Sequence, residues 1–416
     1  MSPSYFDASL SDEVGSCVVA ALDERDSSSV CDSFPGHGNV PESPVIIVGG
    51  GASGLSAAAA LSRQGLEAVV LEQDHELGGT WARRYDRLRL HTVRGFSGLA
   101  HFPVPRRYPL YLSRNDVVAY LNEYARHFGL RIHVGMTVTR IRSRGAASGE
   151  WTVETDGDTW HGRVAVVATG QYRQPVLPAW PGREAYSGRL VHSAAYSNAA
   201  PYVGSRVLVV GAGNSGAEIA TDLVDNGAAY VAVSVRTPPP IVPRDPFGLP
   251  VQRTSILLSA LPAAIANRIG WATTRLALGD LTRYGMPKAD FAPFTTKRIP
   301  LIDVGFVDAL KRRRVTIRPA LERLTPTGAV FSDGTSEPFD AIVAATGFTT
   351  GLESIIDAPG ALDDLGEPRG APGGPTSHPG LYFIGFTHTL RGHLFEANRA
   401  SRRLALNIRR YLMSRA

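Results

Sequence analysis

Two glycine-rich segments have the residue types and spacing that hold the phosphates of a dinucleotide. The first, GGGASG at 49–54, follows the apolar run 45–48 and precedes an alanine-rich stretch from 55 to 63. In the pattern G-x-G-x-x-G the first glycine permits a tight turn, the second lets the backbone approach a pyrophosphate, and the third lets a helix pack on a strand. Free N–H groups at the start of that helix attract the anion. The segment therefore predicts a nucleotide site.

An acidic residue follows this first motif at the distance expected for a ribose contact. Glu72 comes directly after a second apolar run, 68–71, and lies 23 residues after Gly49. A carboxylate at this place can accept hydrogen bonds from ribose hydroxyls and disfavours a 2′-phosphate. The first site is therefore predicted to take FAD or NAD rather than NADP.

The same construction recurs in the middle of the chain. The apolar run 206–210 leads into GAGNSG at 211–216, followed by a helical stretch to residue 226 and a further apolar run, 230–235. That run ends in Arg236 and Thr237 instead of an acid. Because a guanidinium and a hydroxyl suit a 2′-phosphate, the second nucleotide is predicted to be NADPH. The alternative is a surface arginine at the end of a strand.

Two unlike nucleotide sites in one chain indicate electron transfer between cofactors, which a simple binding module does not need. Two further apolar runs end in Ala-Thr-Gly, at 164–170 and 341–347, and each follows a region typical of a β-hairpin. The glycines, Gly170 and Gly347, either let the chain pass close to a bound cofactor or merely leave a sheet.

Composition limits the remaining classes of function. The 416 residues include only two cysteines, Cys17 and Cys31, which excludes a disulfide framework, a zinc cluster or a redox dithiol in the body of the protein. Residues 1–43 hold eight acids and one base, which predicts a disordered acidic tail, no secretory signal and a cytoplasmic location. The rest carries a formal charge of +12, which suits a phosphorylated cofactor; no nucleic-acid-binding signature accompanies it.

The apolar stretch 256–281 raises the question of a membrane contact. Pro262, Arg268, Arg275 and Asp280 interrupt it, so no uncharged run reaches the ~20 residues that a span needs. We therefore expect no stable membrane insertion, and a pair of amphipathic helices that cover the substrate site.

Taken together, the ordered motifs resemble the class B flavin-dependent monooxygenases, specifically the flavin-containing monooxygenases, with the plant YUCCA-type enzymes as the nearest likeness. The family signature F-x-G-x-x-x-H-x-x-x-Y/F has its counterpart in YSGRLVHSAAY at 186–196, where Tyr186 replaces the phenylalanine. The resemblance spans 45–408. Its further motifs are GTW at 79–81, YDRLRLH at 85–91, YGMP at 284–287, IPLIDVG at 299–305 and GLYFIGF at 380–386.

The resemblance implies an α/β protein with two dinucleotide-binding Rossmann-like domains, the NADPH domain being inserted into the FAD domain. The expected bounds are 44–178 with 325–416 for the FAD-binding domain, and 179–324 for the NADPH-binding domain with a helical substrate lid at about 250–290. The FAD-binding residues would be Gly49, Gly51, Gly54, Glu72, Gly79 and Trp81, and the NADPH-binding residues would be Gly211, Gly213, Asn214, Ser215, Gly216, Arg236 and Thr237. Further cofactor-binding candidates are Ala52, Ser53, Thr80, Gly170, Gly347 and Gly385.

For function, the resemblance implies an NADPH- and O2-dependent monooxygenase that acts through a C4a-(hydro)peroxyflavin on a small organic substrate, either an aryl 2-oxo acid or a soft amine or sulfide. His91 is the candidate catalytic residue beside the flavin, whereas His192 in the signature is expected to be structural. A homodimer is the default assembly. The alternatives are an NADPH-dependent flavin oxidoreductase that passes electrons to a quinone or protein without oxygen transfer, and a non-catalytic flavoprotein.

Overall fold

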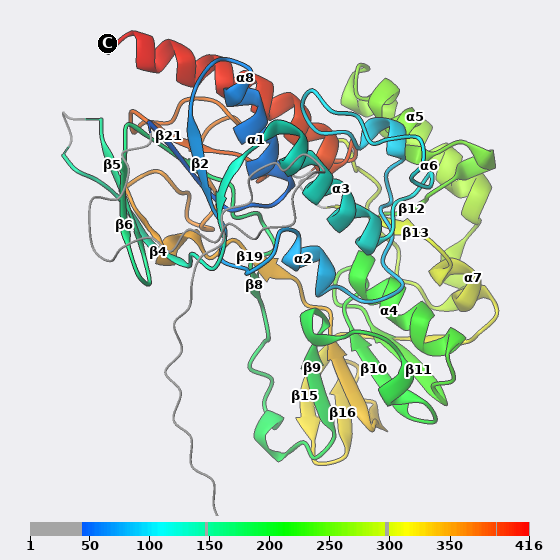
Figure 1. Ribbon diagram of the computed structural model, residues 1–416. Helices are drawn as coiled ribbons and strands as arrows, with labels where there is room; N and C mark the ends of the chain where they lie inside the picture. Colours follow the sequence, from blue (N-terminus) through cyan, green and yellow to red (C-terminus); the bar gives the residue numbers. More distant parts are fainter. Residues whose placement is uncertain (1–43, 146–148, 296–298, 388, 416) are drawn as a thin grey trace, which may run out of the picture.

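The computed structural model describes residues 44–145, 149–295, 299–387 and 389–415, and the predicted acidic tail, 1–43, lies outside them. Two parallel sheets form the centres of two domains, connected by a pair of adjacent linkers (Figure 1). Within the described ranges, no helix combines the length and the apolar character required to cross a bilayer.

The first domain is built on a five-stranded sheet in the order β21-β7-β1-β2-β3, in which every pairing is parallel. Its strands are β1 (Val45–Val48), β2 (Ala68–Leu71), β3 (Arg131–His133), β7 (Val164–Val167) and β21 (Leu381–Phe383). The apolar runs β1 and β7 are buried along their whole length, as expected for a parallel sheet covered on both faces.

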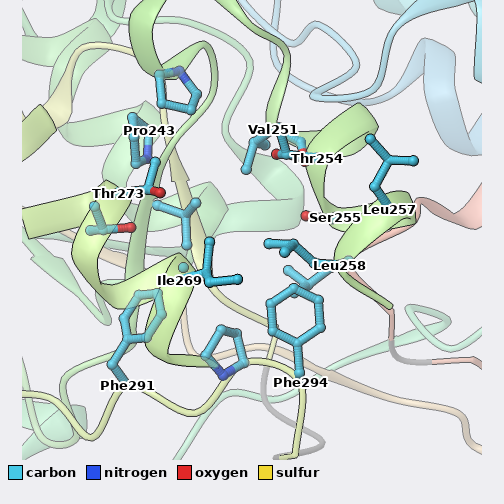
Figure 2. A pocket seen from close by; sticks show the side chains of 16 residues that line it. Pro243, Val251, Thr254, Ser255, Leu257, Leu258, Ile269, Thr273, Phe291 and Phe294 are labelled. Atoms are coloured by element: carbon cyan, nitrogen blue, oxygen red, sulfur yellow. Dashed lines mark hydrogen bonds between the residues drawn. The ribbon is translucent and has the colours of Figure 1, made fainter. Parts of the chain in front are cut away.

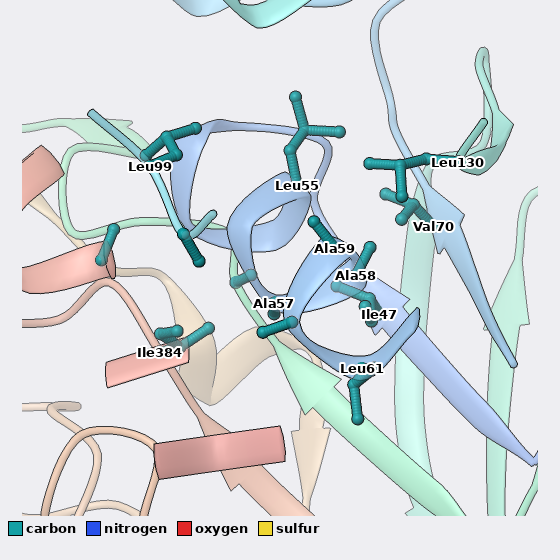
Figure 3. Packing of buried hydrophobic residues seen from close by; sticks show 14 of the residues in the cluster. Ile47, Leu55, Ala57, Ala58, Ala59, Leu61, Val70, Leu99, Leu130 and Ile384 are labelled. Carbon is teal, nitrogen blue, oxygen red and sulfur yellow. The ribbon is translucent and has the colours of Figure 1, made fainter. Parts of the chain in front are cut away.

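Helices cover one face of this sheet. They are α1 (Ala52–Ser62), α3 (Arg114–Phe128) and the long C-terminal α8 (His393–Met413), while the short α2 (Gly79–Ala82) packs beside α3. The small side chains of α1 let it lie between the sheet and α8, with Leu99 and Ile384 on one side and Val70 and Leu130 on the other (Figure 3). A hydrogen bond of 2.8 Å between the hydroxyls of Ser56 and Ser401 joins α1 to α8.

An antiparallel layer covers the opposite face. It contains β4 (Val138–Ser143), β5 (Trp151–Thr155) and β6 (Thr159–Gly162), with β20 (Ile356–Asp357) parallel to β4. Alternate residues of β1 point to the two layers. Val45 and Ile47 pack in the cluster that contains α1 and α8, whereas Ile46 and Val48 pack with Trp151 of β5.

The second domain repeats this plan. Its sheet has the order β14-β11-β10-β18-β9, again all parallel. The strands are β9 (Arg189–His192), β10 (Arg206–Val210), β11 (Tyr230–Ser234), β14 (Val315–Arg318) and β18 (Ala341–Ala344). Residues of α4 (Asn214–Asp225) and α7 (Phe306–Lys311) share a buried cluster with Val207 and Val209. The antiparallel strands β15 (Leu321–Thr325), β16 (Gly328–Phe331) and β17 (Ser336–Pro338) form the other layer, against Leu208 and Val210.

The expected boundary after residue 324 is wrong. The strand β18 pairs with β10 in the second sheet, with Val343 opposite Val209, so the segment 325–345 belongs to the second domain. The reason is that the runs 164–167 and 341–344 are both short, apolar and followed by Ala-Thr-Gly, and such a run does not reveal which sheet it joins. The two linkers between the domains pair with each other as β8 (Gln174–Pro175) and β19 (Phe348–Thr349).

The segment predicted to form a helical lid contains two helices, and its role over a substrate stays a prediction. The helices are α5 (Val251–Leu258) and α6 (Ala263–Leu278), which Pro262 separates. The lid is connected to the second domain through β12 (Ile241–Pro243), which pairs with β13 (Leu301–Asp303). Figure 1 shows α5 and α6 on the same side of the molecule as α3 and the start of α8.

Candidate cofactor and substrate site

The first glycine loop has the geometry that its three glycines predict. Gly49 has φ of +108°, a conformation that strongly favours glycine. A Cβ on Gly54 would lie 1.9 Å from the Gly49 carbonyl oxygen, so only glycine lets α1 approach the loop. A Cβ on Gly51 would meet no heavy atom within 4 Å. This open space lies at the start of α1, where no side chain caps the first-turn N–H groups, and it fits a pyrophosphate.

The second loop reproduces this geometry. Gly211 also has φ of +108°, and a Cβ on Gly216 would lie 1.9 Å from the Gly211 carbonyl oxygen. Gly213 again borders open space, and the first turn of α4 has no side-chain cap. The chain therefore offers two cradles for dinucleotide phosphates, one at each parallel sheet.

Glu72 lies at the carboxyl end of β2, next to the first loop. Its Oε2 accepts a hydrogen bond of 2.6 Å from the amide of Gly50, and its Oε1 accepts one of 3.0 Å from the amide of Asp74. Burial raises the pKa of this carboxyl above its usual value, although the two amides act in the opposite direction. The side chain thus fixes the loop, and each oxygen keeps a lone pair for a ribose hydroxyl.

Of the other predicted cofactor-binding positions, Gly385 lies against the same loop. A Cβ on Gly385 would lie 2.7 Å from the Ser53 hydroxyl, which places the turn after β21 against the start of α1. Gly79 begins α2, which also contains Thr80 and Trp81. Gly170 has φ of +79° and borders open space, and the preceding Thr169 hydroxyl is buried with no hydrogen-bond partner in the described chain. An unpaired buried hydroxyl at this turn fits a bound polar group.

The predicted NADPH-binding residues differ in whether their side chains have hydrogen-bond partners in the described part of the chain. Arg236 and Thr237 follow β11 and are exposed, and no ion pair or hydrogen bond of the Arg236 guanidinium is found in the described part of the chain. The Asn214 amide, by contrast, donates to the Pro300 carbonyl at 3.1 Å and accepts from the Ile302 amide at 2.8 Å. Its side chain therefore positions β13 against α4.

The candidate catalytic residue His91 lies between the domains. Its Nε2 is 2.8 Å from Oε1 of Glu218, a buried residue in the second turn of α4. Burial, with the charge of the nearby Glu218 in second place, raises the pKa of Tyr85. The His91 ring thus joins the first domain to the second, while its role beside a flavin stays a prediction.

Sequence reasoning missed Glu218 and Tyr85. One signal was present: Glu218 follows the glycine motif by two residues, at the start of a helix that must pack on the sheet, and a buried carboxylate needs a partner.

His192 has the structural role that we expected. Its Nδ1 accepts a hydrogen bond of 3.0 Å from the Ala194 amide, so the ring proton of the neutral form is on Nε2, which donates to the Gly347 carbonyl at 3.0 Å. Burial lowers the pKa of this imidazole. The ring therefore holds the turn after β18, and the two tyrosines of the signature are also engaged, Tyr186 with the Phe339 carbonyl and Tyr196 with Asp222.

An apolar cavity of about 210 Å³ lies between the two lid helices. Figure 2 shows side chains of α5 and α6 on opposite sides of it, with Phe291 and Phe294 at one end. Hydroxyls of Thr254, Ser255 and Thr273 are among its few polar groups. The lining also includes Leu390, which comes from the loop before α8, so the cavity extends from the lid to the first domain.

Gln252 ties the lid to the first domain. Its Oε1 accepts a hydrogen bond of 2.8 Å from the Val93 amide, and its Nε2 donates at 2.6 Å to the Arg391 carbonyl. The loops that it bridges also approach each other directly, because a Cβ on Gly392 would lie 2.6 Å from Cγ2 of Thr92. The described residues contain no cluster of three or more side chains that could hold a metal ion.

Comparisons with known proteins agree with this arrangement. A family model described as flavin-binding monooxygenase-like matches residues 42–357. The chain is 36% identical over 354 residues to the indole-3-pyruvate monooxygenase YUCCA1 of Oryza sativa subsp. japonica, covering 82% of this chain and 86% of that protein. A flavin monooxygenase from Stenotrophomonas maltophilia superposes with a TM-score of 0.69 at 26% identity, covering 91% of this chain and 100% of that one.

The fold is similar to that of a further solved structure, an oxidised steroid monooxygenase bound to NADP. The TM-score is 0.70 at 22% identity, with 90% of this chain and 86% of that chain covered. These likenesses confirm the predicted α/β fold with two dinucleotide-binding domains.

Proposed function

We propose that this chain, which belongs to the flavin-binding monooxygenase-like family, oxygenates an aryl 2-oxo acid. It is an FAD-dependent monooxygenase, and FAD and NADPH are the cofactors typical of the family. In the proposed reaction, R–CO–COO⁻, O2, NADPH and H⁺ give R–COO⁻, CO2, NADP⁺ and H2O. The bond between the two carbonyl carbons breaks, one oxygen atom enters the new carboxylate, and the other leaves as water.

The observation that carries the substrate class is the cavity between the two lid helices. Its walls are aliphatic and aromatic, from residues such as Leu258, Ile269 and Phe294, and its volume of about 210 Å³ suits an aromatic side chain. The rice relative is named for indole-3-pyruvate, an aryl 2-oxo acid. We therefore place the aryl group of the substrate in this cavity, with its 2-oxo acid end toward the first domain.

The residues of the chain bind, orient and exclude water. When bound, FAD reduced by NADPH supplies the activation of molecular oxygen. We place FAD at the Gly49–Gly54 loop and NADPH at the Gly211–Gly216 loop, because both loops have the open space and the uncapped helix that a pyrophosphate needs. Gln252 holds α5 against the first domain, so the cavity is shielded where the lid meets the Thr92 loop.

The test supplies holoenzyme with NADPH, ¹⁸O2 and either indole-3-pyruvate or phenylpyruvate. The proposal expects one ¹⁸O atom in the product carboxylate, with one CO2 released per NADPH consumed. Oxygenation of sulfides or amines alone would overturn the substrate class. Oxidation of NADPH without oxygen, with electrons passed to a quinone, would favour the oxidoreductase alternative.

A pair of lid variants tests the cavity itself. Leu258→Trp fills the space between α5 and α6 and is expected to raise KM for the 2-oxo acid by at least tenfold. Leu276→Trp is the matched control, because Leu276 is on α6 but is 77% exposed and does not line the cavity. Equal effects of the two variants would contradict the assignment.

Location and assembly are part of the proposal. The near absence of cysteine, with two in 416 residues, supports a reducing compartment such as the cytoplasm. We propose a homodimer without nucleic-acid partners, which sedimentation of the holoenzyme with and without DNA tests.

A further inference from the structure

Among the described residues, the Arg84 side chain has no anionic partner, and it lies against the linker between the two domains. It follows α2, and its guanidinium carbon lies 4.9 Å from the centre of the Phe348 ring in the linker strand β19. No carboxylate of the described residues pairs with it, and no hydrogen bond of its guanidinium is found among them. The neighbouring Arg83, by contrast, forms a bidentate pair with Asp74, at 2.8 and 2.9 Å.

The position of Arg84 is at the carboxyl edge of the second sheet. In that sheet His192, Ala344 and Val210 are in one row on the neighbouring strands β9, β18 and β10. The ring of His192 lies 5.0 Å from that of Phe348, and the positive charge of Arg84 contributes to lowering the His192 pKa. Val210 of β10 pairs with Ala344 of β18, and neighbouring strands are about 4.8 Å apart. The Gly211 loop, which begins directly after Val210, is therefore one strand away from the end of β18.

A second contact brings the same segment to the start of α4. Tyr85, which follows Arg84, is buried in the same cluster as Ala212 of the glycine motif and Ala217 of α4. The segment that holds Arg84 therefore reaches the second domain beside the second nucleotide cradle.

The surroundings of the guanidinium favour an anionic ligand. Arg84 is partly buried, and burial lowers its pKa, because removing a cation from water is unfavourable when no counter-charge replaces the solvent. Phe348 compensates only in part, since a cation–π contact leaves the five N–H donors unused. A diphosphate would accept hydrogen bonds from several of these donors at once.

We propose that Arg84 binds the pyrophosphate of NADPH from across the domain boundary. The motif at 211–216 contains no lysine or arginine, so its backbone amides alone do not neutralise the two phosphate charges. The 2′-phosphate is expected at Arg236 after β11, on the other side of β10 from β18, which puts the pyrophosphate between the two arginines. Arg84 does not line the lid cavity, so it does not contact the aryl group that we place there.

The inference rests on the proposed use of the second loop for NADPH, and its test measures binding without turnover. FAD-loaded enzyme is titrated with NADP⁺, NAD⁺ and 2′-AMP by calorimetry. Arg84→Gln is expected to raise the Kd of NADP⁺ and NAD⁺ by the same factor, roughly 10- to 100-fold, the usual range for a lost charged hydrogen bond. It should leave 2′-AMP unchanged, since that ligand has no pyrophosphate. Arg84→Lys keeps the charge and should recover part of the affinity.

Two controls separate this role from others. Arg83→Gln removes an adjacent exposed charge and should not change any of the three Kd values. Arg236→Ala should weaken NADP⁺ and 2′-AMP but not NAD⁺. Flavin content and the thermal unfolding midpoint report whether each variant is folded.

An unchanged Kd of NADP⁺ in folded Arg84→Gln would overturn the proposal, and so would an equal loss for 2′-AMP. A raised KM for the 2-oxo acid with an unchanged Kd of NADP⁺ would instead assign Arg84 to the substrate carboxylate. Because no oxygen or substrate is present in the titration, this result is independent of whether the enzyme is a 2-oxo acid monooxygenase.

Discussion

Two glycines three residues apart in the second loop should respond to alanine in opposite ways. At Gly213 the backbone has φ of −75° and ψ of −176°, which alanine adopts readily, and a Cβ would meet nothing within 4 Å. We expect Gly213→Ala to keep or raise the free energy of unfolding by about 0.4–1 kcal/mol, because alanine reduces the entropy of the unfolded chain. Its methyl group would occupy the space assigned to the pyrophosphate, so the Kd of NADP⁺ should rise at least tenfold.

Gly216→Ala should instead damage the fold. The new Cβ would lie 1.9 Å from the Gly211 carbonyl oxygen and 3.2 Å from Cβ of Ala345. An ordinary contact begins near 3.4 Å, so α4 must move by about 1.5 Å away from the loop. Overpacking of this kind costs about 1–3 kcal/mol or more, and we expect that loss in urea unfolding.

The assay combines urea unfolding, flavin content and NADP⁺ titration of both variants. Flavin content should stay at the parent level in Gly213→Ala, because the FAD loop belongs to the other sheet. The reasoning is refuted if Gly213→Ala binds NADP⁺ as the parent does, or if it is less stable than Gly216→Ala.

Three further perturbations test individual residues of the site. Arg236→Ala should weaken NADPH by about 1–3 kcal/mol and hardly affect NADH in fluorescence titrations, whereas equal losses would exclude the 2′-phosphate contact. His91→Ala leaves the buried Glu218 carboxylate without its histidine partner and should lower the free energy of unfolding by about 3 kcal/mol. This value is at the low end of the range for a broken buried pair, because Tyr85 remains near Glu218. A double-mutant cycle with Glu218→Gln should be clearly non-additive, and additive losses would mean that the contact does not form. Because the pKa of Glu72 is raised, the folded state binds the proton of this carboxyl more tightly than the unfolded chain does. The stabilisation that results from proton binding is complete below pH 4.5 and is lost as the pH rises through the folded-state pKa of Glu72. Glu72→Gln should flatten the pH dependence of urea unfolding in that window, and an unchanged profile would contradict the assigned burial effect.

The nucleotide cradles were predictable from sequence because their determinants are local. Each consists of a strand, a tight turn and the start of a helix within about 25 residues, and the requirement for glycine comes from steric contacts inside that unit, such as the one between Gly54 and the Gly49 carbonyl. The lid helices were also visible, since Pro262 divides an apolar stretch whose charges recur on one face. The presence of two such units, with an acid after one and Arg236 after the other, was sufficient to predict two different cofactors.

Tertiary structure alone decided which distant segments meet. The run 341–344 joins the second sheet. A short apolar run of this kind would fit the first sheet equally well, because strand pairing depends on the packing of whole layers. His91 and Glu218 are 127 residues apart in the chain, and only the docking of the two domains brings their side chains to 2.8 Å. The same docking brings the guanidinium of Arg84 over the Phe348 ring of the linker. Asn214 meets the Pro300 carbonyl, 86 residues later in the chain, only when the second domain has folded, because such side-chain partners depend on long-range geometry that local spacing does not encode.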